Sequence, residues 1–209
     1  MLQFTGVEKS YGSKKVLDIP SLELPSGIYW LQGPNGSGKT TLLRVLAGIL
    51  PFYGNIRLKG VNLRGDPVAY RRMIGWADAE PLYPDFLTGE DLLTFYSHIH
   101  RPPAGQVDGL IDLLGVSSWL GSKAVTWSAG MCKKISILLA FIGRPALITL
   151  DEPLITLDQP GVAALHRLID ERSRRDGAGF MISSHQPLPD MTLEGIREME
   201  VLNGIISLI

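Results

Sequence analysis

The stretch Ile28–Gly48, "IYWLQGPNGSGKTTLLRVLAG", runs an apolar strand directly into a glycine-rich loop and then into an amphipathic helix. Within it, Gly33, Gly38, Lys39 and Thr40 fit the pattern G-x-x-x-x-G-K-[ST]. Glycines let the backbone turn successive N–H groups inward, and the start of a helix adds the positive end of its dipole. The stretch therefore predicts a phosphate-binding loop between a strand and a helix.

This loop supplies most of the candidate contacts for a nucleoside triphosphate, ATP or GTP. Lys39 is expected to reach the β- and γ-phosphates, and the Thr40 hydroxyl to ligate Mg²⁺. The helix "KTTLLRVLAGIL" is expected to bury one apolar face that includes Leu42 and Ile49. The loop candidates are Gly33, Pro34, Asn35, Gly36, Ser37, Gly38, Lys39 and Thr40.

A second element, "ALITLDEP", places two carboxylates at the end of an apolar strand. Asp151 is expected to hold Mg²⁺ through water. Glu152 follows it at once and is well placed to orient or deprotonate a water that attacks the γ-phosphate. Alone, this pair would fit a solvated turn, but the phosphate loop upstream favours a catalytic role for Glu152.

Composition bounds the class of protein. The 209 residues are 45% hydrophobic and 20% charged, which fits one globular domain or one core with an inserted subdomain. The formal net charge of −1 and the pI near 6.4 offer no clustered basic footprint, so we expect no nucleic-acid partner.

Three features favour a cytoplasmic chain. The one cysteine, Cys132, fits a reducing compartment and a small buried hydrophobe. The start "MLQFTGVEKSYG" has neither a basic nor an apolar region of a signal peptide. The longest apolar run, Ile135–Gly143, is far shorter than the ~20 residues that span a bilayer. A membrane role would therefore require a partner.

Periodicity divides the rest of the chain. The runs "MLQFTGV" and "KVLDIPSLEL" alternate like strands, "GNIRLKGVNL" resembles a hairpin and "RRMIGWA" a short strand. From Pro81 to about Pro145 the spacing is helical, with Thr88 at a capping-box-like start. Strand character returns in "GFMISSH", after the helix "GVAALHRLIDERSRRDG", and Asn203–Gly204 signals a final hairpin.

These elements predict an α/β fold: a P-loop NTPase core with an N-terminal antiparallel β subdomain and an inserted helical subdomain. We expect residues 1–209 to form one domain, with the helical insert at approximately 81–145.

The order of "GPNGSGKTT", "TWSAGM", "LDEPLITLD" and "SSH" resembles the ATP-binding subunit of ABC transporters over essentially the whole chain. The resemblance implies ATP and Mg²⁺ as cofactors and a head-to-tail homo- or heterodimer around two ATP molecules. It also implies polytopic membrane permease chains as partners, which would hold the subunit at the inner face of the cell membrane.

The family signature L-S-G-G-Q corresponds to Trp127–Met131, where only Ser128 and Gly130 match. Ser128 stands where it would cap the helix "MCKKISILLAFIG", whose free N–H groups and dipole would attract an anion. The resemblance implies that this end faces the ATP of a second subunit. The alternative is a degenerate signature.

Further positions carry over from the family one by one. Tyr11 matches the aromatic residue that stacks on adenine, Val16 packs beside the base, and Thr41 adds a hydroxyl near the α-phosphate. Asp158 closes a loop that touches the opposite subunit, and His185 matches the histidine that contacts the γ-phosphate.

One departure concerns a glutamine that the family places near the metal and the attacking water. In "IGWADAEPLYPD", counting from Ile74–Gly75 puts Ala79 there, and counting back from "LYPD" favours Glu80. We expect Glu80 to serve as the replacement metal-side group.

The expected function is ATP hydrolysis that powers transport, more in line with export than import. The alternatives are a soluble ABC ATPase outside transport and a catalytically weak regulatory subunit. The cargo stays open, since "SAG" and "SSHQPL" are loosely similar to the haem-exporter ATPase of cytochrome c maturation, and "LYPD" to multidrug- or polysaccharide-type exporter ATPases.

Overall fold

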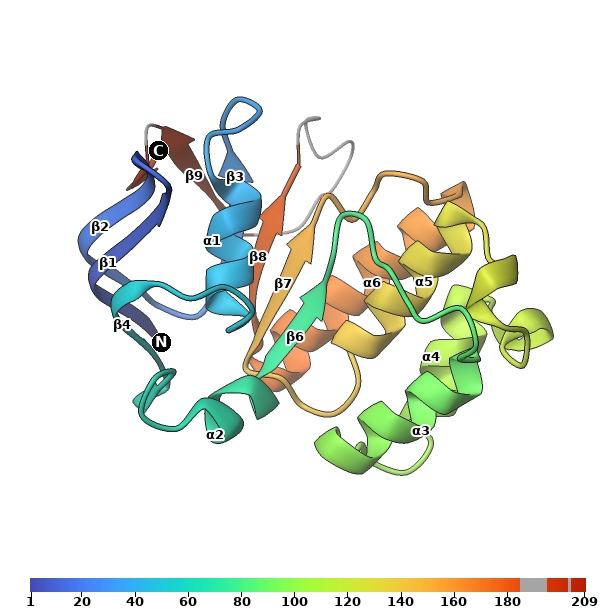
Figure 1. Cartoon of the computed structure of the whole chain (residues 1–209). Helices are drawn as coiled ribbons and strands as arrows, with labels where there is room; N and C mark the ends of the chain where they lie inside the picture. Colours follow the sequence, from blue (N-terminus) through green and yellow to red (C-terminus); the bar gives the residue numbers. More distant parts are fainter. Residues whose placement is uncertain (185–194, 203) are drawn as a thin grey trace.

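A computed structural model describes residues 1–184, 195–202 and 204–209. An antiparallel sheet in the order β2-β1-β4-β5 lies at one side of the molecule (Figure 1). Its strands are β1 (Leu2–Tyr11), β2 (Lys14–Leu24), β4 (Tyr53–Leu58) and β5 (Val61–Asn62). This sheet is the predicted N-terminal antiparallel portion.

The central sheet has six strands in the order β10-β9-β3-β8-β7-β6. Five of them run parallel, and β10 pairs antiparallel with β9 in the predicted C-terminal hairpin. Of that turn, Asn203 lies outside the described residues. The strands are β3 (Ile28–Gln32), β6 (Ile74–Ala77), β7 (Leu147–Asp151), β8 (Gly179–Ser183), β9 (Ile196–Leu202) and β10 (Ile205–Leu208).

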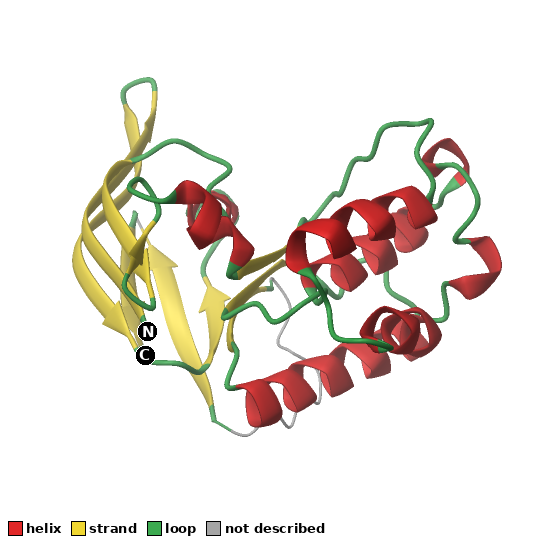
Figure 2. Cartoon of the chain, turned by 90° about the horizontal axis from the view of Figure 1, so that it is seen from below, coloured by secondary structure: helices red, strands yellow, loops and turns green. Residues whose placement is uncertain are grey.

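The helices group on the side away from the antiparallel sheet, apart from α1 and α2 (Figure 2). Thr88 and Asp91 form the predicted capping box at the start of α3, and Gly115 ends α4 in a left-handed conformation. The helices are α1 (Lys39–Leu46), α2 (Pro67–Arg72), α3 (Gly89–His100), α4 (Gln106–Leu114), α5 (Ala129–Ala140) and α6 (Gln159–Asp176), with 3-10 turns at Ser117–Trp119 and Ala124–Thr126.

Two apolar cores lie on the two faces of the central sheet. Leu147 and Met181 join α1 and the antiparallel sheet in one core, while their neighbours Ile148 and Phe180 join α3 to α6 in the other. Successive strand side chains point to opposite faces, so β7 and β8 serve both cores and must be apolar throughout. The carboxyl ends of these strands are thereby fixed against α1 and α5.

Two local predictions were wrong. Arg71 and Arg72 belong to helix α2 and not to a strand, because the Asp66 side chain caps Ala69 N–H and Pro67 favours the first helical turn. The helix from Lys39 ends at Leu46, and Ile49 is 52% exposed instead of packed on its buried face. In the described part of the chain, no helix is both long and apolar enough to span a bilayer.

Candidate active site

The phosphate loop has the conformation that its glycines predict. Gly33 and Gly38 adopt φ of 142° and 111°, values that side-chain-bearing residues rarely reach. A Cβ on Gly38 would also lie 3.0 Å from the Val16 carbonyl oxygen. Helix α1 begins at Lys39 with no side-chain cap, so its first N–H groups are directed into the loop and suit an anion.

Lys39 closes this loop from inside. Its Nζ donates to the carbonyl oxygens of Gly33 at 2.6 Å and Pro34 at 3.2 Å, and the residue is buried. Burial lowers the pKa of the Lys39 ammonium, while the negative charges of Glu152 and Asp151 act in the opposite direction. The ammonium therefore contacts the loop and is within electrostatic range of the predicted metal ligand Asp151 and the predicted catalytic Glu152.

A cavity of about 410 Å³ opens over the loop. Tyr11 and Val16 line it from β1 and β2, and the Lys9 ammonium lies 4.9 Å from the centroid of the half-exposed Tyr11 ring. Their contact with a nucleotide base stays a prediction. A larger cavity of about 600 Å³ lies between α4 and α6, away from the phosphate loop. The smaller cavity is lined by Tyr11, Lys14, Val16, Asn35, Gly36, Ser37, Gly38, Lys39, Thr40 and Thr41.

Two of the three predicted metal ligands, Thr40 and Asp151, lie next to each other. Thr40 Oγ1 donates to Asp151 Oδ1 at 3.2 Å, and Ser183 Oγ donates to the same oxygen at 2.6 Å. Asp151 Oδ2 is buried without a hydrogen-bond partner among the described residues. Hard oxygen donors of this kind fit Mg²⁺, which prefers one or two carboxylates plus phosphate and water oxygens to an all-protein cage.

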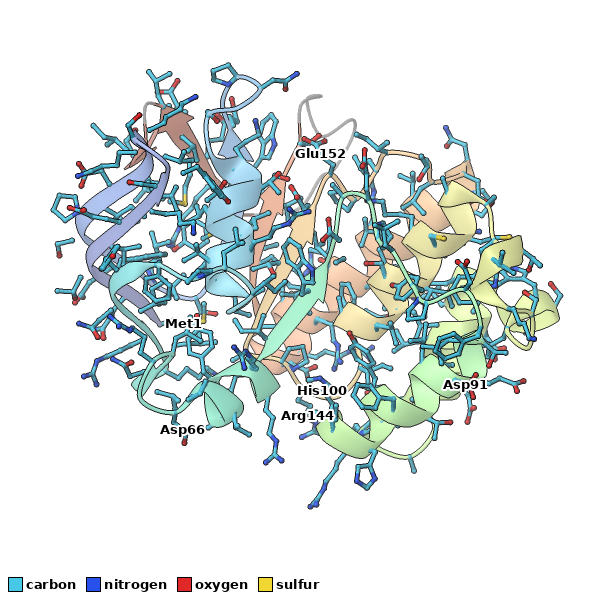
Figure 3. The ribbon with its side chains drawn as sticks, viewed as in Figure 1. Met1, Asp66, Asp91, His100, Arg144 and Glu152 are labelled. Atoms are coloured by element: carbon cyan, nitrogen blue, oxygen red, sulfur yellow. The ribbon has the colours of Figure 1, made fainter. Side chains whose placement is uncertain are left out.

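Glu152 follows at the carboxyl end of β7, where Figure 3 labels it beside the strand ends. It is buried and has a φ of 44°, which is uncommon for a residue with a side chain. Its N–H donates to Ser183 Oγ at 3.0 Å. Strained backbone of this kind costs about 1–3 kcal/mol and persists where surrounding contacts hold it.

The signature segment forms a capped helix start. Ser128 Oγ accepts the Met131 N–H at 3.2 Å, as predicted, and the Met131 sulfur stands 3.5 Å from the Ser128 nitrogen. A Cβ on Gly130 would lie 2.9 Å from the Thr156 carbonyl oxygen, so this position needs glycine for close packing. Neither Ser128 nor Gly130 lines the cavity over the chain's own phosphate loop.

Asp158 caps α6 by accepting the Gly161 N–H at 2.9 Å, and it pairs with Lys134 of α5 at 2.9 Å. The Lys134 hydrogen bond lowers the pKa of the Asp158 carboxyl. Its role toward a second subunit stays a prediction. His185 lies outside the described residues.

The choice between Ala79 and Glu80 also stays a prediction. The Glu80 side chain is exposed, and the Ala79 carbonyl oxygen accepts a hydrogen bond from Lys133 at 2.6 Å. The carboxylate just before them, Asp78, pairs with Arg44 of α1 at 3.1 Å.

Sequence reasoning missed three contributors to this site. Ser183 bridges Asp151 and Glu152, Arg44 holds Asp78, and Lys133 is a buried cation beneath both strand ends. The "SS" before His185 was the available signal for Ser183. Lys133 had none, since two adjacent lysines early in a helix ordinarily indicate a solvated surface.

The fold and the amide-lined loop define a nucleoside-triphosphate-binding protein of the P-loop class. The family model described as "ABC transporter" matches residues 17–155. The chain therefore belongs to the ABC transporter ATP-binding family, as the resemblance of its motifs indicated.

Several relatives match most of the chain. It is 31% identical over 188 residues to the ABC transporter ATP-binding protein YdbJ of Bacillus subtilis, covering 88% of this chain and 61% of YdbJ. It is 32% identical over 198 residues to the zinc import ATP-binding protein ZnuC of Paramagnetospirillum magneticum, covering 88% of this chain and 68% of ZnuC. The cytochrome c biogenesis ATP-binding export protein CcmA of Pseudomonas fluorescens is 32% identical over 196 residues and covers 91% of both chains.

Solved structures share the fold. An ATP-binding subunit of an ABC transporter superposes with a TM-score of 0.88 at 24% identity, over 100% of this chain and 90% of the other. The ATP-binding cassette MJ0796, a dimer bound to ADP and Pi, superposes with a TM-score of 0.84 at 18% identity, over 100% and 98% of the two chains. At these identities the likeness establishes the fold alone.

Proposed function

We propose that this chain binds ATP with Mg²⁺ and hydrolyses its terminal phosphoanhydride bond. The observation that carries the proposal is the convergence of Thr40, Asp151, Ser183 and Glu152 beside the loop that Lys39 closes. Family membership supports it, because ATP hydrolysis is general in the family.

Each residue has a separable part in the reaction. The loop N–H groups and the Lys39 ammonium would offset the charge of the β- and γ-phosphates. Thr40 and Asp151 would hold Mg²⁺, which when bound neutralises charge on the phosphate oxygens. Glu152 would accept a proton from the water whose oxygen bonds to the γ-phosphorus as the bond to ADP breaks. General-base catalysis of this kind contributes about 10²–10⁴ in rate.

A second ABC subunit, identical or different, would complete the site. Helix α5 presents the uncapped part of its N-terminus near Ser128 and Gly130, outside the cavity of its own chain. Helix N-termini bind anions, so these residues would cover the γ-phosphate of a partner copy. MJ0796, which shares this fold, is described as a dimer, and this supports a dimer here. Asp158 would touch the second subunit, and His185 would contact the γ-phosphate.

The free energy of ATP hydrolysis would drive transport by separate membrane permease chains, with this subunit at the cytoplasmic face of the membrane. Relatives named for zinc import and for cytochrome c biogenesis export both match, and we propose export because the CcmA match covers 91% of each chain. A catalytically weak regulatory subunit is a second candidate, favoured by Met131 in the signature and by the lack of a glutamine at either Ala79 or Glu80. A soluble, non-transport ABC ATPase is the remaining rival.

Turnover of ATP by the purified chain tests the first step. We expect hydrolysis that requires Mg²⁺ and falls at least about 100-fold in Glu152→Gln, with ATP affinity retained. ATP binding with negligible turnover in both proteins would favour the regulatory candidate. Copurification of a polytopic membrane chain would distinguish a transporter subunit from a soluble ABC ATPase. Transport by that complex in inverted vesicles would then distinguish export from import.

A further inference from the structure

Helix α5 carries a buried ammonium group that the proposed reaction does not use. Lys133 is 1% exposed, yet its Nζ lies within hydrogen-bonding distance of several backbone carbonyl oxygens. The distances are 2.6 Å to Ala79, 2.9 Å to Asp78 and 3.2 Å to Glu152, with Asp151 at 3.5 Å. An ammonium has three N–H bonds, so the three shorter contacts account for all of them.

Burial of this cation is costly. An ammonium removed from water loses several kcal/mol of solvation even after relaxation, and an apolar side chain of similar length would avoid that loss. Burial lowers the pKa of Lys133, and the charges of Asp151, Asp78, Glu152 and Glu80 oppose the change. The carbonyl contacts are therefore the feature that the apolar alternative could not reproduce.

These carbonyls belong to two segments that leave adjacent parallel strands. Asp78 and Ala79 follow β6, Glu152 follows β7, and both segments pass beside α5 (Figure 1). The Asp78 N–H also donates to Ser136 Oγ of α5 at 3.1 Å. One helix thus fixes both strand exits, and Lys133 is the residue that contacts both.

The Glu152 peptide is held from both sides. Ser183 accepts its N–H, and Lys133 donates to its carbonyl oxygen. Since the φ of Glu152 lies in the left-handed region at 44°, these two contacts oppose relaxation to an ordinary backbone conformation. A changed backbone at Glu152 would turn its carboxylate away from the attacking water.

We propose that Lys133 is a positioning residue that sets the direction of the Glu152 carboxylate and ties it to the segment at Asp78–Ala79 and to the signature helix. This inference rests on the proposed ATP hydrolysis. Its consequence is that a displacement of the Asp78–Ala79 segment alters the hydrogen bond on the Glu152 carbonyl. The segment, the helix that starts at the signature and the catalytic carboxylate would then shift together.

The test compares Lys133→Met with Arg172→Met. Arg172 is a matched control, since it donates to the carbonyls of Phe141 and Gly143 just beyond the other end of α5, away from the phosphate loop. Steady-state turnover gives kcat and KM, binding of a fluorescent ATP analogue gives affinity, and thermal melting gives stability. Both variants are expected to melt below the wild type.

We expect Lys133→Met to lower kcat by about 10- to 100-fold with analogue affinity within about twofold, as when a residue that orients a catalytic group is lost. Arg172→Met should keep kcat. The kcat of Lys133→Gln, which keeps a neutral N–H donor, should lie between those of the wild type and Lys133→Met. If Lys133→Met does not fold, Lys133→Gln carries the test, and its kcat should lie below that of Arg172→Met with analogue affinity within about twofold. Equal kcat in the Lys133 variants and Arg172→Met overturns the proposal, whereas a wild type without turnover overturns the proposed function instead.

Discussion

Replacement of Ser183 by alanine tests the buried hydrogen bonds that hold Asp151, the proposed metal ligand, and Glu152, the proposed general base. The Ser183 hydroxyl donates to Asp151 Oδ1 at 2.6 Å and accepts the Glu152 N–H at 3.0 Å, and all three residues are buried. A hydrogen bond to a charged group contributes about 1.5–3 kcal/mol, and a buried N–H left unpaired costs about 1–3 kcal/mol. Because neighbouring effects do not add fully, we expect the free energy of unfolding to fall by about 2–4 kcal/mol.

Two assays with a matched control make this test sharp. Thr149→Val removes one buried hydroxyl from β7, whose hydrogen bond goes to the Gly75 carbonyl, and should cost about 1 kcal/mol. Urea unfolding measures both variants, and ATP turnover against free Mg²⁺ measures function. Ser183→Ala should lower turnover about 10- to 100-fold and require more Mg²⁺, while Thr149→Val keeps the wild-type profile. A Ser183→Ala protein that unfolds like Thr149→Val and keeps wild-type ATP turnover would show that these hydrogen bonds do not hold the site.

Three further predictions follow from single contacts. Tyr11→Ala should weaken ATP binding by about 1–3 kcal/mol, because the stacking of adenine on the ring is lost, and Tyr11→Phe should keep the wild-type affinity. Calorimetry that gives Tyr11→Ala the affinity of the wild type would contradict a base site at Tyr11. Gly38→Ala should abolish ATP binding, because the φ of Gly38 is 111° and the added Cβ would lie 3.0 Å from the Val16 carbonyl oxygen. Measurable ATP affinity in this variant would show that the loop adapts to a side chain. The Lys134 hydrogen bond lowers the pKa of Asp158 below its ordinary 3.8, so its charge stabilises the fold above that pH and the effect is lost as pH falls through the lowered pKa. Asp158→Asn should therefore have a lower free energy of unfolding than the wild type at pH 6 and the same free energy below the lowered pKa of Asp158. A difference in unfolding free energy that persists below that pKa would exclude the Asp158 charge as its cause.

Local patterns predicted the parts of the site that are contiguous in sequence. The phosphate loop follows from the spacing of Gly33, Gly38 and Lys39, and the capped start of α5 from Ser128. Such features need only neighbouring residues, so a single chain segment specifies them.

Contacts between distant segments could not be predicted in this way. Ser183 reaches Asp151 because β7 and β8 pair in parallel with these two residues in register. Lys133 is buried only because the exits of β6 and β7 pass over α5. Helix α2 was missed because its six residues are too short for a clear helical period.

The central claim is that a second copy completes the ATP site before water attacks. Sedimentation of Glu152→Gln with saturating ATP and Mg²⁺ tests it most directly, beside the same protein carrying Gly130→Glu at the signature. We predict a dimer with ATP, a monomer without it, and a monomer in the Gly130→Glu protein although that protein still binds ATP. A Glu152→Gln chain that stays monomeric while saturated with ATP would contradict the claim.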